Sequence, residues 1–275
     1  MLNNGKEHFY KYVTADAAKL ILKNLQVKYS SPDLFNDPFD NQFDIQINTG
    51  ENKEEVKEIY GRIFDSMARA KKVGASPKES FFAATTLNKN LISVVKEDSE
   101  KTLKIFIDLL RQGNKIFCIS ENYDNLLMWA HYADEHKGAV IKLKCLHKED
   151  TLLCAAEKVQ YSAIMQNPRL DELIVDFDID SSANKIFKDC IYTKSRDWQY
   201  EQEWRVVLPT QDSSSGHTFI NLREEELDSI YLGCKMAESD KQEILGITKT
   251  QRKNIRVFQA EKDAKIFKLN FHGFK

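Results

Sequence analysis

The sequence predicts an α+β fold with a twisted, mostly antiparallel sheet at its core and one inserted helical lobe. Segments typical of strands stand on both sides of a single long helical tract, which favours this fold class. The chain has 275 residues, of which 42% are hydrophobic and 11% aromatic, enough to bury one sizeable core. We therefore expect a single domain over residues 1–275, with the helical lobe at 51–112 inside it.

The N-terminal part predicts a strand, a helix and a second strand. HFYKYV at 8–13 is rich in aromatic and β-branched residues, which favour a strand. Thr14 or Asp16 can cap the helix that follows, and Asn24 offers its end. LQVKYS at 25–30 then predicts the second strand.

Turns, the helical lobe and a series of strands follow. Two prolines and clustered Asp and Asn residues after the second strand favour turns, and another strand is expected at about 42–47. In the lobe, Val56, Ile59 and Ile63 fall on one helical face. The rest of the chain predicts strands at 115–120, 138–145, 157–162, 201–208, 217–222, 228–233, 254–260 and 265–271, and helices at 124–136, 169–190 and 238–250.

Charge and targeting signals narrow the class of protein. Forty basic residues nearly balance 42 acidic ones, so the net charge of −2 gives no global attraction to nucleic acid or to an anionic membrane, although a local basic patch is compatible with it. The N-terminus lacks the apolar core of a signal peptide, and no apolar run approaches the roughly 18–20 residues of a membrane span. The five cysteines are scattered, which is typical of reduced thiols and not of a disulfide framework or a zinc site. We expect a cytoplasmic protein without a membrane partner.

The strand predicted at 201–208 carries the most informative polar side chains. Strand alternation puts Glu201, Glu203 and Arg205 on one face, opposite an apolar face that belongs to the core. The polar face is either a water-facing surface with a cross-strand ion pair or a cleft. In a cleft, one glutamate would meet a polar or cationic reaction centre and Arg205 would bind a phosphate or carboxylate. The pattern leaves both interpretations open.

Two other segments supply aromatic candidates. In the helix predicted at 124–136, the side chains of Trp129 and Tyr132 are more typical of buried structural positions than of a site. His131 can act as a hydrogen-bond donor to a ligand near neutral pH. Tyr10 and Tyr12 share one face of the first strand, where cross-strand packing is the simpler interpretation unless a cleft lies there.

Sequence motifs for common catalytic and metal sites are missing. The chain has no GxGxxG, GxxxxGK[ST], HExxH or GxSxG pattern. The four aspartates at 33–44 lack the spacing of a calcium-binding loop, which Pro38 would also interrupt. Asp37 is instead expected to bond its own backbone in a turn that Phe35 and Phe39 anchor to the core. We expect no bound metal.

Five segments taken together resemble the bacterial family known as domain of unknown function 2971. The resemblance spans most of the chain outside the helical lobe. The segments are FYKYV at 9–13, SSPDLFNDPFD at 30–40, CISENYDNLLMWAHYADEHKGAVI at 118–141, KSRDWQYEQEWRVV at 194–207 and DSIYLGCKM at 228–236.

The N-terminal strand–helix–strand and the late glutamate-bearing strand are in turn similar to those of ADP-ribosyltransferase-like domains, including the toxin and tRNA-phosphotransferase branches. Those domains bind NAD in a cleft between two small sheets. They use a His, Arg or Tyr on the first strand, a Ser or Tyr after the second, and a Glu on a later strand. The resemblance implies that the matching positions here are Tyr10 or Tyr12, Ser30 or Ser31, and Glu203 or Glu201.

This resemblance implies an NAD-consuming ADP-ribosyl or glycosyl transferase, of a toxin or defence type, with NAD as its substrate. The acceptor, a protein or a nucleic acid, stays open. The alternative is a non-catalytic domain that recognises a nucleotide or another partner, and a metal-dependent nuclease ranks third because the ligand spacing is poor. The residues expected to converge on one cleft are Glu203, Tyr10 and His131 as catalytic groups and Tyr12, Ser30, Ser31, Asn36, Trp129 and Arg205 as NAD contacts.

Overall fold

The computed structural model describes residues 4–41, 114–165, 188–209 and 215–274. The helical lobe expected at 51–112 and the strand expected at 42–47 lie outside the described residues. Most of the helix expected at 169–190 lies outside them too. Within the described residues, no helix is long and apolar enough to cross a membrane.

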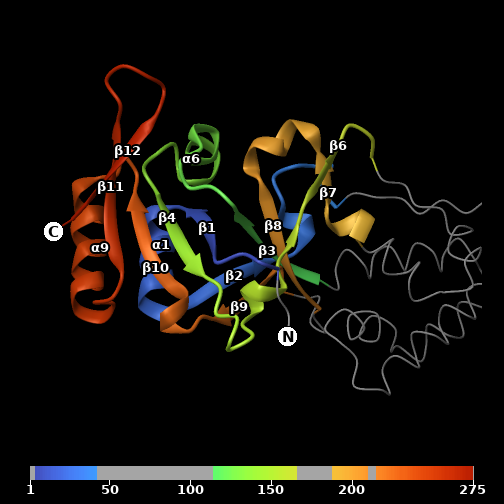
Figure 1. Cartoon of the computed structure of the whole chain (residues 1–275), viewed down its shortest axis with the longest axis horizontal. Coiled ribbons are helices and arrows are strands. Elements are labelled where there is room, and N and C mark those ends of the chain that lie inside the picture. The colour runs from blue at the N-terminus through green and yellow to red at the C-terminus, as the bar shows by residue number, and fades with distance from the viewer. Residues whose placement is uncertain (1–3, 42–113, 166–187, 210–214, 275) are drawn as a thin grey trace, which may run out of the picture.

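The described chain is α+β, with a mostly antiparallel sheet and few helices, which confirms the predicted fold class at this level (Figure 1). Eight strands form a path in the order β12-β11-β10-β4-β1-β3-β2-β9, and β8 and β5 extend it from β3. Strands β10 and β11 run parallel, since α9 carries the chain back between them. The sheet strands are β1 (His8–Val13), β2 (Gln26–Ser30), β3 (Asn114–Ser120), β4 (Ala139–Lys144), β5 (Glu157–Lys158), β8 (Glu203–Pro209), β9 (His217–Asn221), β10 (Leu227–Leu232), β11 (Arg256–Lys262) and β12 (Leu269–Gly273).

Three complete α-helices, the end of another helix at 188–191 and several short elements make up the rest of the described chain. The helices are α1 (Ala15–Asn24), α6 (Leu126–Tyr132) and α9 (Glu238–Gln251). Two short strands, β6 (Gln160–Ser162) and β7 (Thr193–Ser195), pair in parallel in a separate small sheet. Single 3₁₀ turns lie at η1 (Pro32–Leu34), η2 (Leu152–Ala155), η3 (Arg196–Glu201) and η4 (Glu224–Glu226).

The N-terminal strand, helix and strand form as the sequence predicts. The Thr14 side chain accepts a hydrogen bond from the Ala17 backbone N–H at 3.2 Å, so Thr14 is the cap of α1. The helix ends at Asn24, and Leu25 takes a left-handed conformation with φ of 52° before β2 begins. Strand alternation then buries Val27 and Tyr29 in the core.

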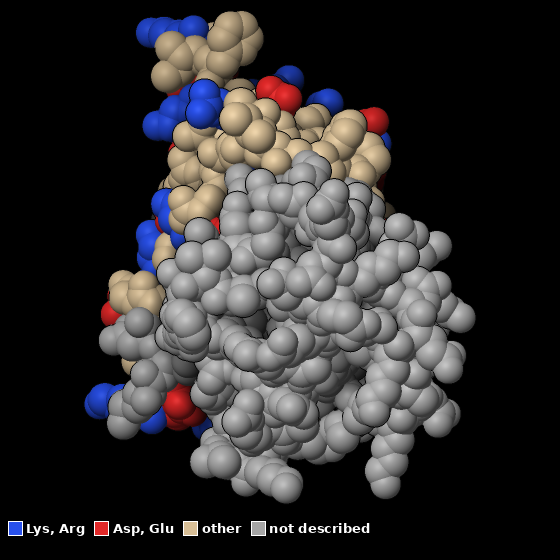
Figure 2. Space-filling view, turned by 90° about the vertical axis from the view of Figure 1, so that its right-hand side faces the viewer, with Lys and Arg blue, Asp and Glu red and all other residues tan. Residues whose placement is uncertain are grey.

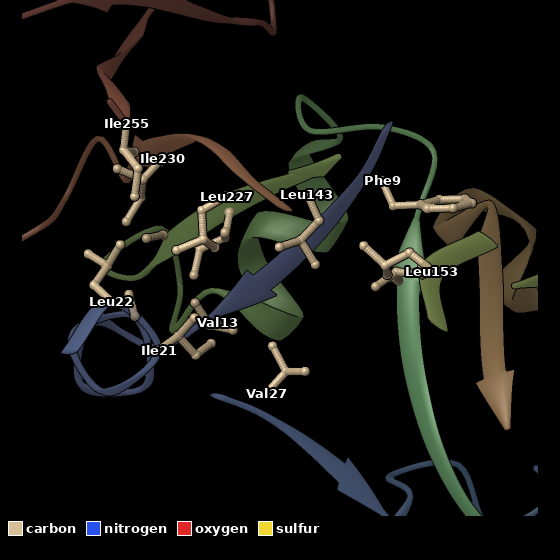
Figure 3. Packing of buried hydrophobic residues seen from close by; sticks show 14 of the residues in the cluster. Phe9, Val13, Ile21, Leu22, Val27, Leu143, Leu153, Leu227, Ile230 and Ile255 are labelled. Atoms are coloured by element: carbon tan, nitrogen blue, oxygen red, sulfur yellow. The ribbon is translucent and has the colours of Figure 1, made fainter. Parts of the chain in front are cut away.

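The main core lies between one face of the sheet and the two helices α1 and α9. Figure 3 shows Ile21 and Leu22 of α1 gathered with Ile230 of β10 and other apolar side chains of the sheet. Leu22 and Ile230 are fully buried, as is Ile244 of α9. Burial of this continuous apolar surface is what holds the two helices on the sheet.

The other face of the sheet is covered by α6, which is shorter than the helix expected at 124–136. Asn125 caps it by accepting from two backbone N–H groups, and the chain after Ala133 turns through three residues of positive φ. Trp129 is fully buried against Tyr12 and donates its indole N–H to the Tyr123 carbonyl at 2.7 Å. The aromatic residues of α6 thus build a second, smaller core.

Candidate functional site

A cavity opens where three strands of the sheet separate. Strand β3 pairs with β8 along its whole length, from Asn114 to Ser120, but in the described chain it pairs with β1 at Ser120 and with β2 at Ile116 alone. Between those two positions β1 and β2 diverge from β3. The space between them is part of a cavity of about 840 Å³, within the range of small-molecule sites.

The Lys11 side chain bridges part of the gap between β1 and β3. Its ammonium donates to the Cys118 carbonyl of β3 at 2.7 Å and lies 5.0 Å from the centre of the Phe117 ring. A side chain therefore takes the place of a ladder hydrogen bond that β1 does not supply. Burial lowers the pKa of Lys11. It also raises the pKa of the Cys118 thiol, an effect that Glu203 reinforces, and this favours the protonated thiol over the thiolate.

The mouth of the cavity is apolar. Leu20 of α1, Leu34 of η1 and Phe219 of β9 all line the cavity, and more than half of each side chain is exposed. Large apolar side chains exposed around one hollow are typical of a ligand-binding surface. One end of the cavity is charged.

Five buried side chains, here called the ionic cluster, lie at that end: Asp40, Lys194, Glu201, Glu203 and Arg205. Arg205 is fully buried; its Nε and Nη2 donate to Glu203 at 2.8 and 3.1 Å, and Nη2 also donates to Asp40 at 2.6 Å. Lys194 of β7 donates to Glu201 at 2.6 Å and to Glu203 at 3.2 Å. Its ammonium also lies 3.5 Å from Asp40. Three carboxylates thus share two cations.

The side chains of Glu201 and Glu203 come close together because the backbone turns at the residue between them, and not because they alternate along one strand. Glu201 ends the 3₁₀ turn η3, Glu203 begins β8, and Gln202 between them is left-handed with φ of 45°. The expectation that both glutamates lie on one regular strand is therefore wrong. They converge because Lys194 lies between them, on a strand that pairs with neither.

The environment moves the pKa values of the two glutamates in opposite directions. Burial alone would raise the pKa of Glu203, but Arg205 and Lys194 outweigh it and hold that pKa well below its usual range. For Glu201, burial and the charge of Glu203 raise the pKa, and Lys194 opposes them only in part. Opposed shifts in neighbouring carboxyls are characteristic of acid–base sites.

Glu201 also has unused hydrogen-bonding capacity. A carboxylate has about four lone-pair positions. Those of Glu203 are taken by two bonds from Arg205, one from Lys194 and one from the Cys118 thiol. Glu201 accepts from Lys194 and from the Tyr132 hydroxyl, so about two of its positions remain. Of the two glutamates, Glu201 is the one able to bind a ligand hydroxyl.

Two consecutive residues of α6 reach this end of the cavity. Tyr132 donates to Glu201 at 2.5 Å and accepts from Asn36 at 3.3 Å, which ties the loop after β2 to the cluster. Burial, together with Glu201, raises the pKa of Tyr132, so its phenol stays protonated. The ring Nδ1 of His131 lies 2.8 Å from the Tyr200 hydroxyl. His131 is exposed at the cavity wall, in edge contact with Trp198.

Most of the residues expected to share a cleft line this cavity. They are Tyr10, Tyr12, Ser30, Asn36, His131 and Glu203. Burial raises the pKa of Tyr10 to about 12, and the Tyr12 hydroxyl donates to the Asn122 carbonyl at 3.0 Å. Both tyrosines therefore present neutral rings to the cavity.

Three expected NAD contacts do not line the cavity. Trp129 is fully buried in the second core. Ser31 is also buried, and its backbone N–H donates to the Gly216 carbonyl. Arg205 lies behind Glu203, and its remaining nitrogen donates to the Ile191 carbonyl. Its three guanidinium nitrogens are therefore all bonded within the protein, and its ion pair with Glu203 is buried instead of facing water.

The acidic loop folds partly as expected. Asp37 accepts from the Phe39 backbone N–H at 2.9 Å, the turn that the sequence predicts. Phe39 is 67% exposed, however, so it does not anchor the turn to the core. Asp40 anchors it instead through Arg205. Among the described residues, no group of three or more His, Cys, Asp or Glu side chains is arranged to hold a metal ion.

Lys194 and Asp40 were not singled out from the sequence as members of a site with the glutamates. Lys194 lies in the same segment as Glu203, but no strand or helix period connects the two positions. Asp40 is 165 positions from Arg205. A lone charged residue in a segment rich in charges gives no signal of burial, so only the fold could reveal them.

A comparison with protein families bears on the same region. Residues 128–206 match a family described as protein of unknown function (DUF2971). The matched segment carries His131 and Tyr132 together with four of the five cluster residues, all but Asp40. No curated protein and no solved structure matches the chain. The ADP-ribosyltransferase-like core therefore has no structural neighbour to support it.

Proposed function

We propose that the cavity binds NAD and that the protein cleaves the nicotinamide–ribose bond, transferring ADP-ribose to an acceptor. The observation that carries the proposal is the pair of buried glutamates at one end of a largely apolar cavity, with pKa values moved in opposite directions. The geometry favours Glu201, rather than the Glu203 expected from the sequence, as the group that meets the substrate.

The chemistry requires a stabilised cation. When the bond between ribose C1′ and the nicotinamide nitrogen breaks, its electron pair leaves with neutral nicotinamide and positive charge develops on the sugar. Glu201 would accept a hydrogen bond from a ribose hydroxyl and stabilise that charge. As the acceptor oxygen bonds to C1′, its proton would pass to Glu201, whose raised pKa suits a general base.

The ionic cluster supports this role electrostatically. Its three carboxylates exceed its two cations by one negative charge when all are ionised. A developing cation near Glu201 would compensate that excess inside a site where burial limits screening by water. Glu203 and Lys194 would act as positioning residues. Lys194 bonds both glutamates and so fixes Glu201, and neither Lys194 nor Glu203 has a hydrogen-bonding position left for the substrate.

Other residues of the cavity suit the rest of the dinucleotide. Tyr10 and Phe35 line the cavity, and their rings would pack against nicotinamide or adenine. Because Arg205 is occupied, the pyrophosphate would be bound by Lys28, which is exposed at the cavity wall, with help from Lys11. This assignment replaces the sequence-based role of Arg205.

The experiment follows nicotinamide release and label transfer from labelled NAD. Glu201→Gln should lower turnover by about 10²–10³-fold, as the loss of one electrostatic stabiliser does in other enzymes. Glu226→Gln is the matched control, since Glu226 is a buried glutamate of raised pKa that does not line the cavity. It should keep full turnover. A wild-type protein that folds but releases no nicotinamide, or a fully active Glu201→Gln variant, would contradict the proposal.

A non-catalytic recognition domain is the second candidate. It is favoured by one observation: each carboxylate of the ionic cluster already bonds a cation, as a purely structural network would require. Calorimetry separates the two, because a recognition domain would bind NAD or another nucleotide without releasing nicotinamide.

A further inference from the structure

The loop that joins β11 and β12 presents two apolar side chains to solvent. Phe267 is completely exposed, at 101%, and its neighbour Ile266 is 62% exposed. Figure 1 shows this loop rising above the rest of the described chain. The protrusion stands at the top of Figure 2, where basic and uncharged side chains cover its end. The sequence predicts a strand at 265–271, but β12 begins only at Leu269.

The loop is held in a defined shape. One oxygen of Asp263 accepts from the backbone N–H groups of Lys265 and Ile266, at 2.8 and 3.2 Å, and the other accepts from the Asn270 side chain at 2.9 Å. The Asp263 backbone N–H also donates to the Lys268 carbonyl at 3.0 Å. The exposed side chains therefore project from an ordered turn, and their exposure is imposed by these hydrogen bonds.

The surroundings of the two apolar side chains are basic. Lys262, Lys265 and Lys268 are all exposed within the seven residues KDAKIFK, whose only acid is Asp263, and that carboxylate bonds inward. Lys235, from the loop between β10 and α9, joins them along a hollow of about 460 Å³ beside the turn. This is a local basic patch on a chain whose net charge is −2.

We propose that this turn binds the surface of an anionic lipid bilayer, with Phe267 and Ile266 in the headgroup–acyl boundary and the lysines on the headgroups. A bilayer accommodates both an aromatic and an aliphatic side chain at a convex tip and attracts the lysines around it. A nucleic acid would also attract the lysines, but it offers no apolar environment suited to Ile266. Such contact with a surface needs no spanning segment, and the proposal departs here from the sequence-based expectation of no membrane partner.

The full chain is tested by sedimentation with vesicles of phosphatidylcholine alone and of phosphatidylcholine mixed equally with phosphatidylglycerol. We expect binding to the anionic vesicles only, weakened by salt. Phe267→Ser together with Ile266→Ser should lower the binding constant about tenfold or more. Lys265→Gln and Lys268→Gln should each lower it about fivefold.

Ile164→Ser is the matched control, because Ile164 is 77% exposed on a different part of the chain. It should bind anionic vesicles like the wild type. The proposal is overturned by a wild-type protein that ignores anionic vesicles, by equal binding to neutral ones, or by a Phe267→Ser, Ile266→Ser variant that binds unchanged. Binding to duplex DNA in place of vesicles would overturn it in favour of a nucleic-acid contact.

Discussion

The apolar core beneath α1 and α9 and the ionic cluster at the end of the cavity are both buried, but different forces hold them. Leu22, Ile230 and Ile244 are held by the apolar area they remove from water, so another apolar side chain of similar volume can replace each of them at a small cost. In the ionic cluster each charge was taken out of water at a cost that only its specific partners offset. Because this cost offsets most of the gain from the ion pairs, such a cluster adds little net stability to the fold. Its presence therefore indicates a role other than stability.

One strand supplies both regions. Along β8, Trp204 and Val206 point into the apolar core, and Glu203 and Arg205 point into the ionic cluster. The two regions therefore share a backbone, and small changes on its two faces should have very different consequences.

The largest loss of stability is expected when one carboxylate of the ionic cluster is replaced by an amide. Glu203→Gln removes a negative charge and leaves Arg205 and Lys194 buried with fewer partners, which should cost about 3–5 kcal/mol in the free energy of unfolding. Urea denaturation measures it, with Glu226→Gln as the control of small cost. A loss below about 1 kcal/mol would mean that Glu203 behaves as an exposed pair.

A smaller effect is expected from an equally small change in the apolar core. Ile244→Val removes one methylene from a fully buried side chain and should cost about 0.5–1.5 kcal/mol. The same denaturation experiment applies. A cost equal to that of Glu203→Gln would erase the distinction between the two regions.

The smallest expected effect is a change in the pH dependence of stability. Because the pKa of Glu201 is raised in the folded protein, the folded state binds more protons than the unfolded state just above the usual value of 4.5. That contribution makes stability fall as pH rises through this window. Glu203, with its lowered pKa, acts oppositely and loses its contribution as pH falls below 4.5.

Urea midpoints measured across this pH range test the assignment. In Glu201→Gln the fall of stability above pH 4.5 should be smaller than in the wild type, since Glu226 is then the only described carboxyl group whose raised pKa contributes to it, and the loss at lower pH should remain. An unchanged slope above pH 4.5 would show that Glu201 does not carry the raised pKa.

The pattern of residue types was enough to predict the faces of the strands but not what covers them. Alternation correctly separated Trp204 from Glu203 and Arg205, and the Thr14 cap was recognisable from its side chain. Whether the polar face meets water depends on Asp40, which is 165 positions from Arg205, and on Lys194, which no strand or helix period connects to the glutamates. The left-handed Gln202 gives no signal either, since Gln has no preference for that conformation.

The position of β2 between β3 and the edge strand β9 has a consequence for synthesis on the ribosome. The partner of β2 at the sheet edge is β9, and the side chains of Gln26 and Asn221 that bond across them are 195 positions apart. At usual translation rates the second strand emerges about 10–40 s before that neighbour exists. During this interval its hydrogen-bonding edge is unpaired on the nascent chain, which leaves it open to edge-to-edge pairing with another chain.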